Sequence, residues 1–234
     1  MTSHRILAMV CGQPPEEIES AYGDYMRWFT DAMGPRVTLE PWDVRKRQSE
    51  PDLRTYSGMV VTGAPASLTQ PEPWMENAIE LIRQAAETET PVLGVCFGHQ
   101  LIGCAFGAPT VPADGEGEHG SHPVTLTETG KTDPLFADMP ETFLAQLTHY
   151  DQVDPQAVSF SNGLRVLARS AGCAIQALAA GDHIRSVQYH PEFSTQLMQR
   201  YLDDRENAPR AQDGSMASKV FHNWINHWIV GKAT

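Results

Sequence analysis

A cysteine between two glycines is the residue whose setting most favours chemistry. The segment 94–98 reads Gly-Val-Cys-Phe-Gly, the G-x-C-x-G spacing of a nucleophile elbow with Cys96 in place of serine. An apolar run at 91–95 and small residues at 99–106 predict a buried strand that turns directly into a helix. Such a turn is too tight for side chains at the two glycine positions on either side of the nucleophile. A helix N-terminus directly after the cysteine favours the reactive thiolate. An isolated motif of this kind is equally compatible with a buried cysteine at a strand end.

A histidine that could serve as base for this thiol ends another apolar run, at 184–189. His190 is followed by Pro191, which cannot continue a central strand, and then by Glu192. A carboxylate at that position can accept a hydrogen bond from the second imidazole nitrogen and hold its tautomer. Alone, the segment would fit a solvated strand end with an incidental charge. Together with the elbow, it predicts a Cys–His–Glu triad.

A turn of small residues follows the apolar run at 58–61. It reads Thr62-Gly63-Ala64-Pro65, and small residues expose backbone N–H groups of the kind that an oxyanion hole requires. An ordinary turn at the end of a strand is the alternative, and without the elbow it would be the better interpretation.

Apolar runs alternate with helical patterns in the first half of the chain. Strands are expected at 5–10, 37–40, 58–63 and 91–95, and helices at 16–33, 73–89 and 99–106. Fully apolar strands joined by helices predict an α/β fold with an open, mostly parallel sheet covered by helices on both faces.

The second half contains short strand patterns without long helices between them. These strands are expected at 123–127, 143–147, 164–168, 174–178 and 184–189. They predict antiparallel additions to the sheet. A polar loop or an irregular helix start is expected at 203–218 and a closing amphipathic helix at 220–230, so residues 1–234 are predicted to form a single domain.

The charge balance argues against several classes of partner. Seventeen Lys and Arg face 29 Asp and Glu, a net charge of −12. Neither nucleic acid nor an anionic membrane is expected to bind, because both attract basic surfaces. No apolar run approaches the ~20 residues of a membrane span. The run at 6–11 is too short for the core of a signal peptide, which leaves a cytoplasmic protein as the prediction.

Cysteine and histidine spacing predicts no metal site, and no cofactor is expected. Cys11, Cys96, Cys104 and Cys173 lie far apart and form no CxxC pair, which speaks against a zinc knuckle and a disulfide scaffold. His119 and His122 lie in a glycine-rich acidic stretch that offers no further ligands. No G-x-x-x-x-G-K-[ST] phosphate-binding loop occurs in the sequence.

At this point the sequence resembles the class I glutamine amidotransferase family, the type with a Cys-His-Glu triad. The matching segments are "GMVVTGAPAS" (58–67), "PVLGVCFGHQLIGCAFGA" (91–108), "LTHYDQV" (147–153) and "VQYHPEFS" (187–194). The chain is most similar to stand-alone members such as γ-glutamyl peptidases and to the glutaminase domain of GMP synthase. The resemblance implies a flavodoxin-like sheet.

The resemblance also implies a role for each matching residue. Cys96 would be the nucleophile, His190 the general base and acid, and Glu192 the residue that orients the imidazole. The backbone N–H groups of Ala64, or Gly63, and of Phe97 would form the oxyanion hole.

Further residues of the matching segments would hold the substrate. Gly98 and Gln100 would border the γ-glutamyl pocket, and the α-amino and α-carboxylate end would contact Thr148, His149, Tyr150 and Asp151. His149 is also a weaker candidate for the base. One departure stands out: the family's oxyanion turn often has two glycines before the proline, whereas this chain has Ala64, which disfavours positive φ.

Three functions follow as expectations from the resemblance. The first is hydrolysis of glutamine or a γ-glutamyl compound through a γ-glutamyl thioester, by a protein that acts alone. The second is a glutaminase subunit that delivers ammonia to a separate synthase, since about 40 residues follow Glu192 and leave no room for an attached one. The third is a non-catalytic binding protein of the same fold, against which the intact triad argues.

Overall fold

A computed structural model describes residues 3–46, 49–158, 162–206 and 208–231 of the chain. The predicted single domain over 1–234 includes residues outside these ranges and stays a prediction. The main sheet contains β1 (His4–Val10), β2 (Val37–Asp43), β3 (Gly58–Val61), β4 (Val92–Val95), β6 (Glu118–Leu126), β7 (Thr142–His149), β9 (Leu164–Arg169), β10 (Ala177–Ala180) and β11 (Ile184–Val187). The helices are α1 (Glu16–Tyr22), α2 (Tyr25–Met33), α3 (Pro73–Glu87), α4 (Phe97–Ala105), α5 (Glu128–Lys131), α6 (Thr195–Asp203) and α7 (Lys219–Trp224).

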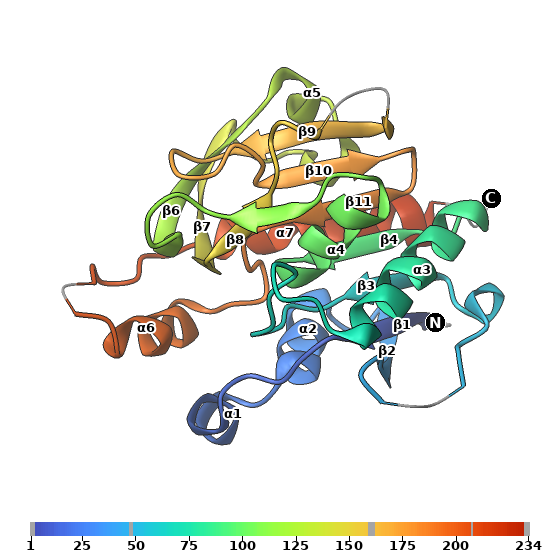
Figure 1. The fold of residues 1–234 in the computed structure, drawn as a ribbon, viewed down its shortest axis with the longest axis horizontal. Coiled ribbons are helices and arrows are strands. Elements are labelled where there is room, and N and C mark those ends of the chain that lie inside the picture. The colour runs from blue at the N-terminus through green and yellow to red at the C-terminus, as the bar shows by residue number, and fades with distance from the viewer. Residues whose placement is uncertain (1–2, 47–48, 159–161, 207, 232–234) are drawn as a thin grey trace.

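Nine strands form one sheet in the order β2-β1-β3-β4-β11-β10-β9-β6-β7 (Figure 1). The first five of these run parallel, and β10, β9, β6 and β7 continue the sheet in antiparallel fashion. The short strands β5 (Thr110–Pro112) and β8 (Asp151–Val153) pair separately. The predicted α/β fold with a parallel core and added antiparallel strands is confirmed.

One strand of the second half, β11, pairs in parallel with the core on one side and antiparallel with β10 on the other. The expectation for 184–189 was wrong in this respect, since β11 pairs in parallel with β4 from Ile184 beside Val92 to Val187 beside Val95. The reason is the turn after β10, where Gly181 takes a φ of +57° and the chain reverses. The chain that leaves β11 therefore emerges beside the carboxyl end of β4.

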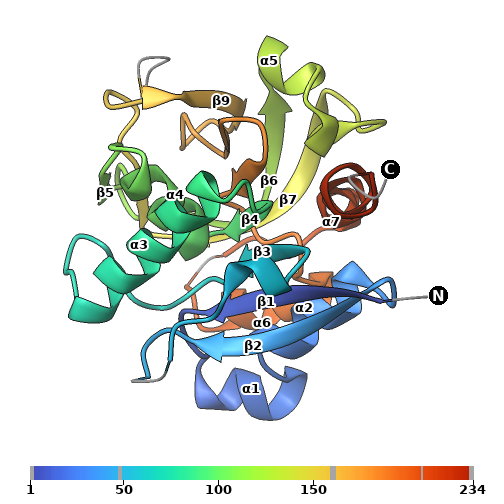
Figure 2. The same cartoon turned by 90° about the vertical axis from the view of Figure 1, so that its right-hand side faces the viewer.

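Both faces of the sheet are covered by helices, as predicted. Along β1, Ile6 and Ala8 face a core shared with α2 and α7, whereas Leu7 and Met9 face α3 and α4. Figure 2 shows α3 and α4 on one side of the sheet and α7 on the other. The closing helix is α7 together with a π-helical turn at Ile225–Val230, and its aromatic residues are buried as expected.

Two helical segments differ from the sequence prediction. The helix expected at 16–33 is broken at Gly23, which has a φ of +85°, and Asp24 begins α2 by accepting a hydrogen bond from the Arg27 N–H. The helix α6 was not predicted, although Ser194 caps it by accepting from the Leu197 N–H at 3.1 Å. The expected strand at 174–178 lies at Ala177–Ala180. The segment 203–218, expected as a loop or an irregular helix start, ends in a 3₁₀ turn at Ser215–Ser218 that leads into α7.

A third apolar cluster joins α1, α2 and α6 at one end of the sheet (Figure 1). Trp28 of α2 packs edge-to-face on Phe193, which precedes α6. The packing fixes α6 beside the chain that follows β11. Among the described residues, no helix is both long and apolar enough to cross a membrane.

The first turn of α4 lies closer to the sheet than side chains would allow. A Cβ atom at Gly94 would lie 2.7 Å from the Gly98 carbonyl oxygen, and one at Gly98 would lie 2.5 Å from the Val61 carbonyl oxygen. Backbone atoms cannot give way as a flexible side chain can. The expected crowding on either side of the elbow is confirmed.

We therefore expect Gly98→Ala to destabilise the protein by about 1–3 kcal/mol, the usual range for overpacking. Thermal unfolding should show the melting temperature falling by roughly 2–4 °C per kcal/mol. The matched control is Ala105→Ser in the last, partly exposed turn of the same helix; it should change stability by less than about 0.5 kcal/mol. Equal melting temperatures for Gly98→Ala and the unmodified protein would contradict the crowding.

Candidate active site

Cys96 occupies a strained backbone position between β4 and α4. Its φ of 52° and ψ of −103° lie in a region that residues with a side chain rarely adopt, at a cost of about 1–3 kcal/mol. The Cys96 N–H donates to the Val187 carbonyl oxygen at 2.9 Å, which ties the elbow to β11. The residue is 6% exposed. Strain of this kind persists where the surrounding structure holds it, and it occurs mostly at functional sites.

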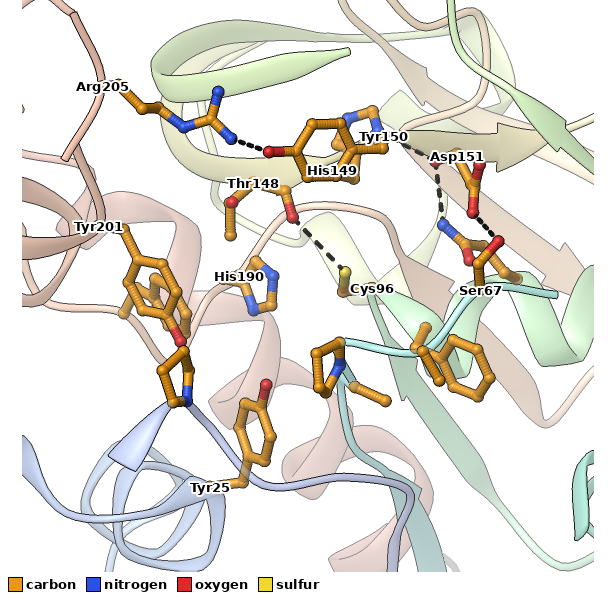
Figure 3. Close-up of a pocket in the computed structure, with 17 residues that line it drawn as sticks. Tyr25, Ser67, Cys96, Thr148, His149, Tyr150, Asp151, His190, Tyr201 and Arg205 are labelled. Carbon is orange, nitrogen blue, oxygen red and sulfur yellow. Dashed lines mark hydrogen bonds between the residues drawn. The ribbon is translucent and has the colours of Figure 1, made fainter. Parts of the chain in front are cut away.

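A buried His–Glu pair lies beside the cysteine. His190 Nδ1 donates to Glu192 Oε1 at 2.7 Å, and the two side chains are 4% and 0% exposed. The His190 ring stacks on Phe193 with 4.2 Å between ring centroids, and its backbone N–H donates to the Gln146 carbonyl oxygen. The other ring nitrogen, Nε2, is buried and has no hydrogen-bond partner among the described residues. Figure 3 shows the His190 ring beside Cys96.

The charges around His190 favour its protonated form. Burial lowers the pKa of His190, but the Coulombic interactions with Cys96 and Glu192 outweigh burial and raise this pKa well above its ordinary value. The arrangement therefore suits an imidazolium that stabilises a thiolate and can give up its proton to a neighbouring atom.

A cavity of about 330 Å³ opens above the cysteine, which is within the size range of small-molecule sites. Most of the predicted site residues line it: Ala64, Cys96, Phe97, Gln100, Thr148, His149, Tyr150, Asp151 and His190. Glu192 lies behind His190. Gly98 is not among the lining residues, because its α-carbon packs on Val61, so its predicted contact with substrate stays a prediction.

The two backbone donors expected for an oxyanion hole lie at the elbow and at the turn after β3. Phe97 is the first residue of α4, where an N–H has no acceptor within the helix. Ala64 lines the cavity and is not among the described non-glycine residues with positive φ, so its methyl group causes no backbone strain. A Cβ atom at Gly63 would lie 3.2 Å from His190 Cε1 and 3.7 Å from Cys96 Cβ. The lack of a side chain at Gly63 thus leaves room for the imidazole.

Two glutamines connect the thiol to the cavity wall. Gln188 Nε2 lies 3.7 Å from Cys96 Sγ and can donate to it, while Gln188 Oε1 accepts from Gln100 Nε2 at 3.2 Å. Gln100 Nε2 also donates to the Asp151 carbonyl oxygen at 3.0 Å. Gln188 was not predicted. The sequence feature that could have predicted it is its position two residues before His190, because alternate residues of an extended segment point the same way.

The cavity has a polar end opposite His190, at Asp151. The Asp151 carboxylate accepts a hydrogen bond from the Ser67 hydroxyl (Figure 3). His149 Nδ1 donates to the Asp151 carbonyl oxygen at 3.0 Å, and His149 Nε2 lies 3.3 Å from Glu118 Oε2. A negative charge therefore faces this end of the cavity, and a second buried carboxylate holds His149 from behind.

Glu118 also belongs to a separate cluster behind the cavity. Its carboxylate accepts hydrogen bonds from Ser170 and Gln176, both at 2.8 Å, and Cys173 Sγ lies near it and near His149. The three donor atoms of Glu118, His149 and Cys173 fall within 4.8 Å of one another, a spacing at which a metal ion could be held. This cluster is distinct from the predicted triad and shares none of its residues.

Several lining residues were not predicted as site residues, although some of them lie in the segments 58–67 and 187–194 that the sequence marked as functional. They are Pro15, Tyr25, Pro65, Ala66, Ser67, Phe193, Tyr201 and Arg205. Tyr201 and Arg205 lie on and just after α6, the helix that was not predicted. Their only sequence signal was the capped pattern of Leu197, Met198 and Leu202, which predicts a buried helix but not its neighbours.

A comparison with protein families decides what kind of protein carries this site. The family profile described as "Glutamine amidotransferase class-I" matches residues 30–206. The chain belongs to the class I glutamine amidotransferase family. Cys96, the Thr148–Asp151 segment and His190 all fall within the match.

Individual relatives divide between peptidases, synthases and amidotransferase-like proteins. Gamma-glutamyl peptidase 3 of Arabidopsis thaliana is 26% identical over 196 residues, 80% of this chain and 76% of the relative. The glutamine amidotransferase-like protein YfeJ of Salmonella typhimurium is 33% identical and covers 79% of this chain and 75% of the relative. The GMP synthase [glutamine-hydrolyzing] of Thermomicrobium roseum is 34% identical over 58% of this chain. The match spans 23% of that enzyme.

Solved structures share the fold. A glutamine amidotransferase from Thermotoga maritima superposes with a TM-score of 0.75 at 19% identity, over 98% of this chain and 99% of that one. At this identity the likeness establishes the architecture of the sheet and its helices.

The buried pair yields a prediction for His190. We expect Glu192→Gln to lower the pKa of His190, because the substitution removes the Glu192 carboxylate, one of the two groups that raise this pKa. The loss should be on the order of one pKa unit or more. An NMR titration of the His190 ring nitrogens measures it. Glu141→Gln is the control, since Glu141 pairs with Lys131 on the surface, and equal His190 pKa values in Glu192→Gln and this control would contradict the charge coupling.

Proposed function

We propose that this protein is a cysteine-dependent hydrolase of γ-glutamyl amide bonds that turns over its substrate without a partner protein. The observation that carries the proposal is the strained Cys96, which opens onto a cavity beside the buried His190–Glu192 pair. A structural cysteine at a strand end would need neither the strain nor a charged partner. Membership of the amidotransferase family supports the same chemistry.

The first half of the reaction forms a thioester. The Cys96 thiolate attacks the side-chain amide carbon of the γ-glutamyl group, and the carbonyl oxygen becomes an oxyanion that the N–H groups of Ala64 and Phe97 would hold. The C–N bond then breaks as His190 gives its Nε2 proton to the leaving nitrogen. The amine departs, and the γ-glutamyl group remains on Cys96 Sγ.

The second half consumes water. His190, now neutral, takes a proton from a water molecule, whose oxygen attacks the thioester carbon. The C–S bond breaks, glutamate leaves, and the thiolate–imidazolium pair is restored. Glu192 would hold the imidazole with Nδ1 toward the carboxylate in both halves, so that Nε2 always faces the reacting atoms.

The γ-glutamyl group is proposed to extend from Cys96 toward Gln100 and Asp151. A substrate α-ammonium group would find the Asp151 carboxylate there, and its α-carboxylate the backbone N–H groups of the 148–151 segment. His149 would close this end of the cavity, and the Tyr150 side chain would lie between this end and Arg205. These substrate contacts are predictions from the sequence, as are the roles of the oxyanion donors, Gly98 and Gln100. Structures of substrate complexes would test them.

An amidotransferase subunit that passes ammonia to a separate synthase is the second candidate. The similarity to a GMP synthase favours it, whereas the similarity to γ-glutamyl peptidases over a larger share of this chain favours the independent hydrolase. A non-catalytic binding protein is the third candidate, and the strained Cys96 argues against it. We further propose a cytoplasmic location, which suits four free cysteines, and a reaction that needs no cofactor.

Purified protein should release glutamate from a γ-glutamyl dipeptide or from glutamine, and Cys96→Ala should reduce kcat at least about 1000-fold, as removal of a nucleophile does. Cys104→Ala is the matched control, because Cys104 lies on α4 with its thiol toward Thr110 and outside the lining residues. Wild-type turnover by Cys96→Ala would refute the proposal. Turnover that appears only after a synthase is added would support the subunit candidate instead.

A further inference from the structure

An arginine without a carboxylate partner lines the cavity. Arg205 is the one Lys or Arg among the described lining residues, in a chain with a net charge of −12. No described carboxylate lies within ion-pair distance of its guanidinium, whereas Arg200 in the preceding helix pairs with Asp204 at 2.7 Å. In such an acidic protein, a guanidinium without a carboxylate partner is available to bind an anionic group of a ligand.

The guanidinium is held in place by neutral contacts. It donates to the Tyr150 hydroxyl and lies over the Tyr150 ring, 5.3 Å from the ring centroid (Figure 3). The Tyr150 ring in turn packs on His119, with 4.7 Å between centroids. Burial and then the charge of Arg205 lower the pKa of His119 to about 4, so this histidine is neutral at pH 7. The contacts orient Arg205 without neutralising it, and they leave other N–H groups of the fork available.

Arg205 lies on the side of the cavity where the leaving group must be. In Figure 3, Arg205 and Tyr201 lie on the same side of Cys96 as His190, and Ser67 and Asp151 lie on the other side. If His190 protonates the leaving nitrogen, as in the proposed function, that nitrogen and its substituent face His190 and not Asp151. The wall there is aromatic, formed by Tyr25, Phe193 and Tyr201 together with Arg205.

We propose that Arg205 binds a carboxylate on the leaving group, so that the substrates are γ-glutamyl amino acids or short γ-glutamyl peptides with a free C-terminal carboxylate. The inference rests on the proposed function and names its substrate class. Ammonia, the leaving group of glutamine, has no carboxylate for Arg205 and no side chain for the aromatic wall. The amide C–N bond breaks as in the proposed reaction, and the leaving amine departs as a free amino acid or peptide carrying the proton from His190.

The test compares two substrates that differ at one group. They are γ-glutamylglycine and its C-terminal amide, γ-glutamylglycinamide, and the measured quantity is the ratio of their kcat/KM values. Differences in intrinsic reactivity cancel when this ratio is compared between variants. We expect Arg205→Gln to lower the ratio about tenfold or more, the usual loss when a charged hydrogen bond is removed. Arg205→Lys, which keeps the charge but loses the fork, should restore part of the ratio.

Arg210→Gln is the matched control, because it removes an exposed arginine of the same loop that does not line the cavity. Its ratio should equal that of the unmodified protein. An equal loss on both substrates in Arg205→Gln, or an unchanged ratio, would overturn the inference. The equal loss would assign Arg205 to the shared γ-glutamyl group. Both results would leave the proposed function intact, whereas failure of every γ-glutamyl compound to acylate Cys96 would refute the proposed function as well.

Discussion

The close approach of α4 to the sheet is the constraint on which the candidate site depends. Gly94 and Gly98 allow the first turn of the helix to touch β3, and Cys96 is left with a φ of 52° at the junction. The Val187 carbonyl oxygen accepts from the Cys96 N–H, so the elbow is also tied to β11. Because β11 is parallel to β4, the chain that follows it carries His190 to the same edge of the sheet. The strain at one residue is thus supported by three neighbouring strands.

Three carboxylates lie around this edge of the sheet, each at a different part of the cavity wall. Glu192 lies behind His190, Glu118 lies behind His149, and Asp151 faces the cavity itself. Arg205 supplies the opposite charge on the far side of the cysteine. A chain with a net charge of −12 therefore has a cavity whose ends differ in sign, an arrangement suited to a substrate with an ammonium group at one end and a carboxylate at the other.

The sequence predicted those parts of the fold and site whose signals are local. The elbow and the His190-Pro191-Glu192 segment each lie within a few residues, and apolar strands followed by helices predicted the parallel core. The contacts that were missed join distant segments: β11 pairs with β4, with Ile184 beside Val92, and the Glu118 carboxylate accepts a hydrogen bond from Ser170, 52 residues later in the chain. No sequence pattern marked Arg205 as a site residue, because its place at the cavity comes from the packing of α6 against α1 and α2 through apolar side chains.

The most direct test of the central claim, that Cys96 carries the γ-glutamyl group, is mass spectrometry of protein quenched in acid during turnover of a γ-glutamyl substrate. We predict a γ-glutamyl group on the peptide that contains Cys96 and on none that contains Cys11, Cys104 or Cys173. Steady turnover combined with an adduct on another cysteine, or with no adduct under conditions where the second half of the reaction is slowed, would contradict the claim.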